Sequence, residues 1–218
     1  MPMISFNNIC KIYSRNKVFY DASLSICRGD FIFLTGESGS GKTTFLRLLS
    51  GLESPDRGKI YVLDTDISKH NKKELSDFRR KIGIIMQDNI FIENETVSYN
   101  VSLPLLISNG KDIKSKVNAV LKLVELDNKG NKIIKTLSAG ERQRIAIARA
   151  IINKPDIILA DEPTGNLDYK LSTNIIKMLI KLSKYGATVI VATHEFSLVK
   201  ELKQKVININ NEKFYIKG

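Results

Sequence analysis

Hydrophobic and polar residues alternate along residues 3–28 of the chain. The segments ISFNNICKIY and VFYDASLSIC place apolar side chains at every second position over part of their length. Such alternation is typical of strands with one buried face and one solvated face. We therefore expect antiparallel strands at the N-terminus.

The rest of the chain alternates between short apolar runs and helical repeats. Pro104 is expected to break the apolar segment VSYNVSLPLLI, within a mainly helical region at 88–153. Because strands that alternate with helices form a mostly parallel sheet, the pattern predicts an α/β fold. The other predicted helices cover about 42–52, 72–80, 114–126 and 171–182, and the strands cover 31–35, 59–63, 81–86, 156–160, 188–193 and a hairpin at 206–216.

Length and composition favour one domain with an inserted lobe. A chain of 218 residues with 43% hydrophobic residues can bury a substantial core. We expect a single domain over 1–218, in which 1–87 and 154–218 form a β subdomain and core, and 88–153 form a helical subdomain. The start of the chain lacks a signal-peptide pattern, and Cys10 and Cys27 are expected to be buried free thiols, so a cytoplasmic location is predicted.

The formal net charge of +11 raises the question of a polyanionic partner. The basic residues are spread along the chain, and few aromatic residues lie among them. A solvated lysine-rich surface is therefore the first interpretation, and attraction to anionic lipid at a membrane face is the second. No nucleic-acid partner is expected.

A glycine-rich stretch, GESGSGKTT, separates the apolar run FIFL from a leucine-rich helical repeat. It fits G-x-x-x-x-G-K-[ST], in which backbone N–H groups and a helix N-terminus bind phosphate. Lys42 would reach the β- and γ-phosphates, and the Thr43 hydroxyl would hold Mg²⁺. The flanking strand and helix favour a nucleotide site over a flexible linker. The predicted binding residues are Gly36, Glu37, Ser38, Gly39, Ser40, Gly41, Lys42, Thr43 and Thr44.

Two carboxylates follow the apolar strand DIILA in the stretch DIILADEP. Beside a phosphate loop, Asp161 can hold the Mg²⁺ shell and Glu162 can polarise an attacking water. An acidic helix cap is the alternative. The glycine-rich loop upstream favours the catalytic interpretation.

The stretch LSAGERQRIAIARAI predicts a helix with a capping box between Ser138 and Glu141. A hydroxyl, free N–H groups and a helix dipole also make a second anion site.

Three further polar residues lie at the ends of predicted strands. His194 and Gln87 each follow a buried strand, and Tyr13 ends the first strand and could stack on a base.

Together these stretches resemble the ATP-binding subunit of the ATP-binding cassette (ABC) superfamily, over nearly the whole chain and in the family's order. The resemblance implies a P-loop NTPase (RecA-like) core that binds ATP and Mg²⁺. It implies that Tyr13 stacks on adenine, that the metal is held by Thr43, Gln87 and Asp161, and that Glu162 is the catalytic base. It also implies that Gln87 belongs to the Q-loop, which senses Mg²⁺ and the membrane partner, and that His194 is the switch histidine. The signature loop would consist of Ser138, Ala139, Gly140 and Glu141, and the D-loop of Asn166 to Asp168.

The resemblance also implies a head-to-tail homodimer that sandwiches two ATP molecules. The signature loop of one subunit would close over the ATP held by Lys42 of the other. One departure concerns Ala139, where the family usually has glycine. Because alanine disfavours positive φ, we expect looser closure and slower turnover, with hydrolysis retained. A scaffold that hydrolyses ATP poorly is the alternative.

Within the superfamily, GDFIFLTG, FRRKIGIIMQD and ADEPTGNLD resemble a branch of cell-division, lipoprotein-releasing and macrolide-export ATPases (FtsE, LolD and MacB). The cell-division members are the most similar. This implies a peripheral protein on the cytoplasmic side of the inner (plasma) membrane, an FtsX-like integral membrane partner, and regulation of cell-wall hydrolases. The alternative is the ATPase subunit of a lipoprotein-releasing or small-molecule export transporter.

Overall fold

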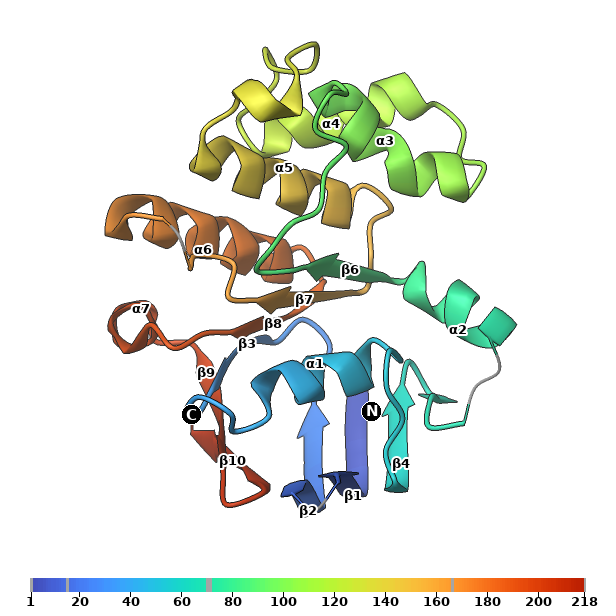
Figure 1. Ribbon diagram of the computed structural model, residues 1–218, viewed down its shortest axis with the longest axis vertical. Helices are drawn as coiled ribbons and strands as arrows, with labels where there is room; N and C mark the ends of the chain where they lie inside the picture. The colour runs from blue at the N-terminus through green and yellow to red at the C-terminus, as the bar shows by residue number, and fades with distance from the viewer. Residues whose placement is uncertain (1, 15, 70–71, 166, 218) are drawn as a thin grey trace.

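The computed structural model describes residues 2–14, 16–69, 72–165 and 167–217, and contains two β-sheets with helices around them (Figure 1). The first sheet has four strands in the order β2-β1-β4-β5, and all its neighbours are antiparallel. Phe6 on β1 lies opposite Leu24 on β2, and both side chains are buried. The predicted N-terminal antiparallel strands are confirmed. They are β1 (Ile4–Tyr13) and β2 (Asn16–Ile26), and the sheet is completed by β4 (Arg57–Val62), which was expected only as a short strand, and by β5 (Thr65–Asp66), which was not predicted.

The second sheet has six strands in the order β10-β9-β3-β8-β7-β6, and only β10 runs antiparallel to its neighbour. Parallel strands carry their carboxyl ends to one edge, where polar loops from distant parts of the chain meet. The register pairs Asp161 at the end of β7 with Ala192 at the end of β8. The strands are β3 (Phe31–Thr35), β6 (Ile82–Ile85), β7 (Ile157–Asp161), β8 (Thr188–Ala192), β9 (Lys205–Asn210) and β10 (Lys213–Lys217).

Two hydrophobic cores lie on the two faces of this sheet. Phe45 and Leu48 of α1 (Lys42–Leu49) pack with the antiparallel sheet in one core. The other core joins Phe33 of β3 to Ile176 of α6 (Tyr169–Lys184) and Ile145 of α5 (Ala139–Ile151). The remaining helices are α2 (Lys72–Arg79), α3 (Val97–Ile107), α4 (Ile113–Leu123), the 3₁₀ turn η1 (Ile134–Thr136) and α7 (Phe196–Leu202).

Helices α3, α4 and α5 lie together beyond the edge strand β6, away from the antiparallel sheet (Figure 1). The predicted α/β architecture, with a mostly parallel core, an N-terminal antiparallel sheet and a helical subdomain, is confirmed. The proposed division at 87/88 and 153/154 stays a prediction. Within the part of the chain that the structure describes, no helix combines the length and apolarity needed to cross a membrane.

Three expectations differ from the structure. Helix α3 continues through Pro104, because Val101 before it and Leu105 after it are both buried and hold the two parts of the helix against one core. Cys27 is exposed, since it lies one residue beyond the end of β2, whereas Cys10 is buried, and both thiols are free. The short helix α7 follows β8 without having been predicted.

Candidate active site

The glycine-rich loop connects β3 to α1 with a backbone that side chains would obstruct. Gly41 has φ of 107°, and a Cβ atom there would lie 2.5 Å from Cγ1 of Val18. Gly36 has φ of 153°, and its Cβ atom would lie 2.8 Å from the carbonyl oxygen of Ile209. Gly41 also provides no side-chain cap for α1, so no side chain competes for the first N–H groups of the helix. The loop therefore has the backbone conformation that an anion-binding turn needs.

Lys42 begins α1 and its side chain folds back across the loop. Its ammonium group donates to the carbonyl oxygens of Gly36 at 2.9 Å and Glu37 at 3.1 Å. The hydroxyl of Ser40 in the same loop is buried and has no hydrogen-bond partner among the described residues. A buried polar group without a partner is rare in native proteins, and a phosphate oxygen would satisfy this one.

Thr43 and Asp161 meet at the edge of the parallel sheet. The Thr43 hydroxyl donates to Oδ2 of Asp161 at 3.0 Å, although the two residues are far apart in sequence. Burial raises the pKa of the Asp161 carboxyl, the Thr43 hydrogen bond opposes that rise, and the neighbouring Glu162 charge adds to it. Two adjacent oxygen donors suit a hard cation such as Mg²⁺, which commonly takes one or two protein oxygens and completes its shell with phosphate and water. The residues present therefore fit the predicted metal.

Glu162 and His194 form a direct contact. Nδ1 of His194 lies 2.8 Å from Oε1 of Glu162, while Oε2 of Glu162 is buried without a hydrogen-bond partner in the described chain. Glu162 has φ of 47°, a conformation that is uncommon for residues other than glycine and that concentrates at functional sites. Its side chain is 12% exposed, and that of His194 is 68% exposed. One carboxylate oxygen is thus anchored, and the other remains available as an acceptor.

Gln87 is exposed and lines a cavity of about 340 Å³ together with Glu162 and Ala139. The cavity lies between the loop that follows β6, the start of α5 and the loop that follows β7. The structure thus brings Gln87 beside the candidate base. It shows no direct contact between Gln87 and the Thr43–Asp161 pair.

The signature stretch caps α5 as predicted. The Ser138 hydroxyl accepts from the N–H of Glu141 at 3.3 Å, and the Glu141 carboxylate accepts from the N–H of Ser138 at 2.9 Å. Ala139 is the first residue of the helix and is not among the residues with positive φ, so the expected backbone strain is absent there. Gly140 is the more crowded position, because a Cβ atom there would lie 3.2 Å from Cδ1 of Leu171 and that side chain would have to shift slightly.

Tyr13 ends β1, as expected, and is 39% exposed. Its hydroxyl donates to Glu53, and Lys11 lies over its ring. In the D-loop, Asn166 lies outside the described residues. Asp168 serves as the N-cap of α6 and accepts from the N–H of Leu171 at 3.0 Å.

The sequence did not predict the contacts that join the loop after Gln87 to α5. The ring of Phe91 contacts two guanidinium groups, and its centroid lies 5.3 Å from Cζ of Arg142 and 4.7 Å from Cζ of Arg149. Arg142 also binds Glu93 through two hydrogen bonds, the longer of which is 2.8 Å. The available signal was the spacing of the two arginines, because residues seven apart on one helix lie on the same face. Nothing in the sequence indicated which aromatic ring they contact.

Comparison with known proteins agrees with this site. The family model described as "ABC transporter" matches residues 19–165. The cell division ATP-binding protein FtsE of Escherichia coli K12 is 39% identical over 212 residues, which cover 96% of each chain. FtsE of Bacillus subtilis is 38% identical, over 96% of this chain and 93% of its own. A methionine import ATP-binding protein, MetN 1 of Bacillus thuringiensis, is also 38% identical, over 99% of this chain and 66% of its own.

Solved structures show the same fold. The ATP-binding cassette MJ0796, in a dimeric post-hydrolysis state bound to ADP and Pi, superposes with a TM-score of 0.87 at 32% identity, covering 99% of this chain and 98% of that chain. A dimeric structure of the same bacterial cassette gives a TM-score of 0.86 at 34% identity, with 97% and 96% coverage. Sequence, fold and the arrangement of the phosphate loop, Asp161 and Glu162 agree, and the chain belongs to the ABC transporter family as an ATPase of the ATP-binding cassette type.

Proposed function

We propose that this ATPase is an FtsE-like subunit that works with an FtsX-type integral membrane protein and couples ATP hydrolysis to cell division through regulation of cell-wall hydrolases. The observation that carries the proposal is the similarity to FtsE proteins along almost the whole chain, at 39% identity for the Escherichia coli protein. The proposed location is the cytoplasmic face of the inner membrane. The proposed active form is a homodimer that sandwiches ATP.

In the proposed site, the loop 36–44 and Lys42 bind the phosphates, and Tyr13 stacks on adenine. Mg²⁺ would be held by Thr43 and Asp161, with Gln87 nearby, and when bound it would neutralise charge on the β- and γ-phosphates. Two close oxygens, 3.0 Å apart, support this assignment.

Glu162 is the proposed general base. Its unpartnered Oε2 accepts a proton from the attacking water, while His194 fixes the opposite oxygen at 2.8 Å. No donor among the described residues competes for Oε2. Ser138, Ala139, Gly140 and Glu141 would close the site of the second subunit from the N-terminus of α5.

A groove on the helical side supports a membrane partner. A cavity of about 410 Å³ lies between α2, β6, α3 and α5, and Ile107 and Arg149 are among its lining residues. Ile107 is 74% exposed, and Ile90, on the loop that Arg149 contacts, is 85% exposed. Exposed apolar side chains grouped around a groove are typical of a protein interface.

The proposal is tested by a pull-down from detergent-solubilised membranes with tagged Glu162→Gln protein and ATP, and mass spectrometry to identify the partner. The matched control carries Lys42→Ala as well, since it should not hold ATP. A single four-span protein with a modest extracytoplasmic domain, recovered with division proteins, is the expected result. A pair of larger permeases, or a permease with an efflux adaptor, would instead identify a transporter and overturn the cell-division proposal.

A second candidate is the ATPase of an importer. The methionine import protein MetN 1 matches this chain at 38% identity, one percentage point below the Escherichia coli FtsE. Identity alone therefore does not separate the two functions. In the same pull-down, an importer permease would favour this candidate.

A further inference from the structure

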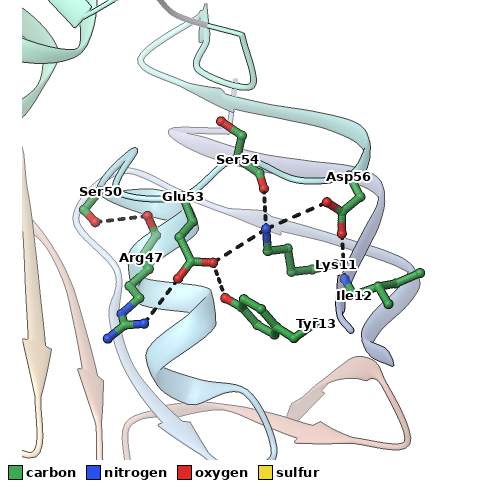
Figure 2. A network of polar contacts seen from close by, with 8 residues as sticks. All are labelled: Lys11, Ile12, Tyr13, Arg47, Ser50, Glu53, Ser54 and Asp56. Carbon is green, nitrogen blue, oxygen red and sulfur yellow. Dashed lines mark hydrogen bonds and ion pairs between the residues drawn. The ribbon is translucent and has the colours of Figure 1, made fainter. Parts of the chain in front are cut away.

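Tyr13 is held in a network of charged groups at the end of β1 (Figure 2). Its hydroxyl donates to Oε2 of Glu53, a residue in the segment that follows α1. The ring is thus fixed through its oxygen rather than through packing alone, and 39% of the residue stays exposed.

Glu53 is itself fixed by two cations. Its Oε1 lies 3.2 Å from Nη1 of Arg47, and its Oε2 lies 3.6 Å from Nζ of Lys11 (Figure 2). Burial raises the pKa of the Glu53 carboxyl, but the hydrogen bonds from Tyr13 and Arg47 and the charge of Lys11 lower that pKa by more, so it lies below its ordinary value. An ionised carboxylate only accepts hydrogen bonds, so the Tyr13 hydroxyl must point at it.

Lys11 covers the Tyr13 ring. Its ammonium group lies 5.1 Å from the ring centroid and donates to the carbonyl oxygen of Ser54 at 3.0 Å. Asp56 lies 3.8 Å from the same nitrogen and accepts from the N–H of Ile12 at 2.6 Å. With a cation fixed on one side, a flat ligand can stack only on the opposite face of the ring.

The network also connects the ring to the phosphate site. Arg47 lies on α1, whose first residues are Lys42 and Thr43. Through Arg47, Glu53 links the Tyr13 ring to the helix whose N-terminus binds phosphate. The nucleotide itself sets the distance between its base and its phosphates. The base can therefore stack on Tyr13 while the phosphates bind at the start of α1 only if the ring and the helix are held at a matching distance.

We propose that Glu53 is a positioning residue for nucleotide binding, which orients Tyr13 so that its free face accepts the adenine base at the distance that the phosphate loop requires. The inference rests on the proposed stacking role of Tyr13. It adds a second residue, outside the motifs that the sequence analysis identified, on which base affinity depends.

The test measures the Kd of Mg-ATP and of inorganic tripolyphosphate, in the Glu162→Gln background so that neither is hydrolysed. Glu53→Ala and Tyr13→Phe should each raise the Kd of Mg-ATP about three- to tenfold, the loss expected when one positioning hydrogen bond is removed. The Kd of tripolyphosphate should stay unchanged in both, because it has no base. Glu53→Gln should recover part of the affinity, since its amide oxygen still accepts from the tyrosine hydroxyl.

Asp156→Asn is the control, because it alters a carboxylate that pairs with Arg28 at 3.1 Å, outside the network around Tyr13. It should leave both Kd values unchanged. The double variant Tyr13→Phe, Glu53→Ala should bind Mg-ATP no more weakly than the weaker single variant, since both remove the same contact. Additive losses, or equal losses for ATP and tripolyphosphate, would overturn the proposal and indicate a general structural role for Glu53.

Tyr13→Ala separates this inference from the proposal on which it rests. Loss of the ring should raise the Kd of Mg-ATP about tenfold or more by removing base stacking. If Tyr13→Ala has no effect, the stacking role of Tyr13 is wrong, and the inference about Glu53 is overturned with it. If Tyr13→Ala weakens ATP binding and Glu53→Ala does not, Tyr13 keeps its role and the inference about Glu53 alone is wrong.

Discussion

Glu162 combines three features at the scale of a single residue: a positive φ of 47°, a buried Oε2 without a partner among the described residues, and a hydrogen bond that Oε1 accepts from Nδ1 of His194. Glu125 and Glu212 also have positive φ, so the buried Oε2 and the contact with His194 are the features that fit a carboxylate that receives a proton. The first prediction follows from this geometry.

Glu162→Gln should lower the turnover number for ATP by about a hundredfold or more, because the amide cannot accept a proton. The Kd of ATP should change little, since Lys42 and the loop 36–44 stay intact. Steady-state phosphate release and equilibrium nucleotide binding measure the two quantities. Equal rates for wild type and variant, both near background, would contradict the catalytic role of Glu162 and favour a scaffold.

Ala139→Gly should leave turnover unchanged. Ala139 lies in the first turn of α5 without positive φ, so a glycine at this position would relieve no backbone strain. Glycine in a helix should lower the free energy of unfolding by up to about 1 kcal/mol. Phosphate release and urea unfolding measure the two effects, and a clear rise in turnover would show that the methyl group obstructs closure of the dimer.

The position of Glu162 and His194 at one sheet edge could be predicted from the sequence, but their direct contact and the environment of Tyr13 could not. Glu162 and His194 each follow an apolar strand, and parallel strands bring such residues to one edge. The residues that contact Tyr13 are Glu53 and Lys11, and no periodicity or motif in the sequence connects these positions with Tyr13. Side-chain pairs between segments distant in sequence depend on packing that a single sequence does not specify.

At the scale of elements, α5 depends on its capping box. Glu141 accepts from the N–H of Ser138 and lies 3.2 Å from Nζ of Lys129. The backbone hydrogen bond from Ser138 lowers the pKa of the Glu141 carboxyl most, with burial opposing and Lys129 assisting. The folded state therefore binds its proton at lower pH than the unfolded state does.

The stability that Glu141 contributes should be complete above the ordinary glutamate pKa and should be lost as pH falls through the lowered folded pKa. Ser138→Ala should cost about 1 kcal/mol at neutral pH, as expected for a lost N-cap. In Glu141→Gln, the free energy of unfolding should fall less steeply as pH is lowered than it does in the wild type. Urea unfolding of wild type and both variants across this range measures the effect, and an unchanged profile for Glu141→Gln would contradict it.

Helix α3 shows why the ends of helices and strands were harder to predict from the sequence than their presence. Pro104 indicates a break by local rules, yet buried Val101 and Leu105 on its two sides hold one continuous helix against the core. Strands were predicted more closely, because their apolar runs coincide with burial on both faces of the parallel sheet, as in β8. In α3, burial in the core outweighed the local tendency of proline to break a helix. In β8, burial and local strand propensity favoured the same element.

At the scale of the whole molecule, the two proposed anion sites come from different parts of the fold. One lies at the start of α1, beside Thr43 and Asp161, and the other lies at the start of α5, on the helical side beyond β6. Two structures of the cassette MJ0796 are dimeric, and one of them is bound to ADP and Pi. A second copy of the chain that brings its α5 over the phosphate loop would use both sites on the same ATP.

The most direct test of this account is light scattering coupled to gel filtration of Glu162→Gln protein in saturating Mg-ATP, with bound nucleotide counted in each peak. The account predicts a dimer that contains two ATP molecules, and a monomer when Lys42→Ala is added. A monomer with ATP bound would contradict the central claim that the site is completed by a second copy of the chain.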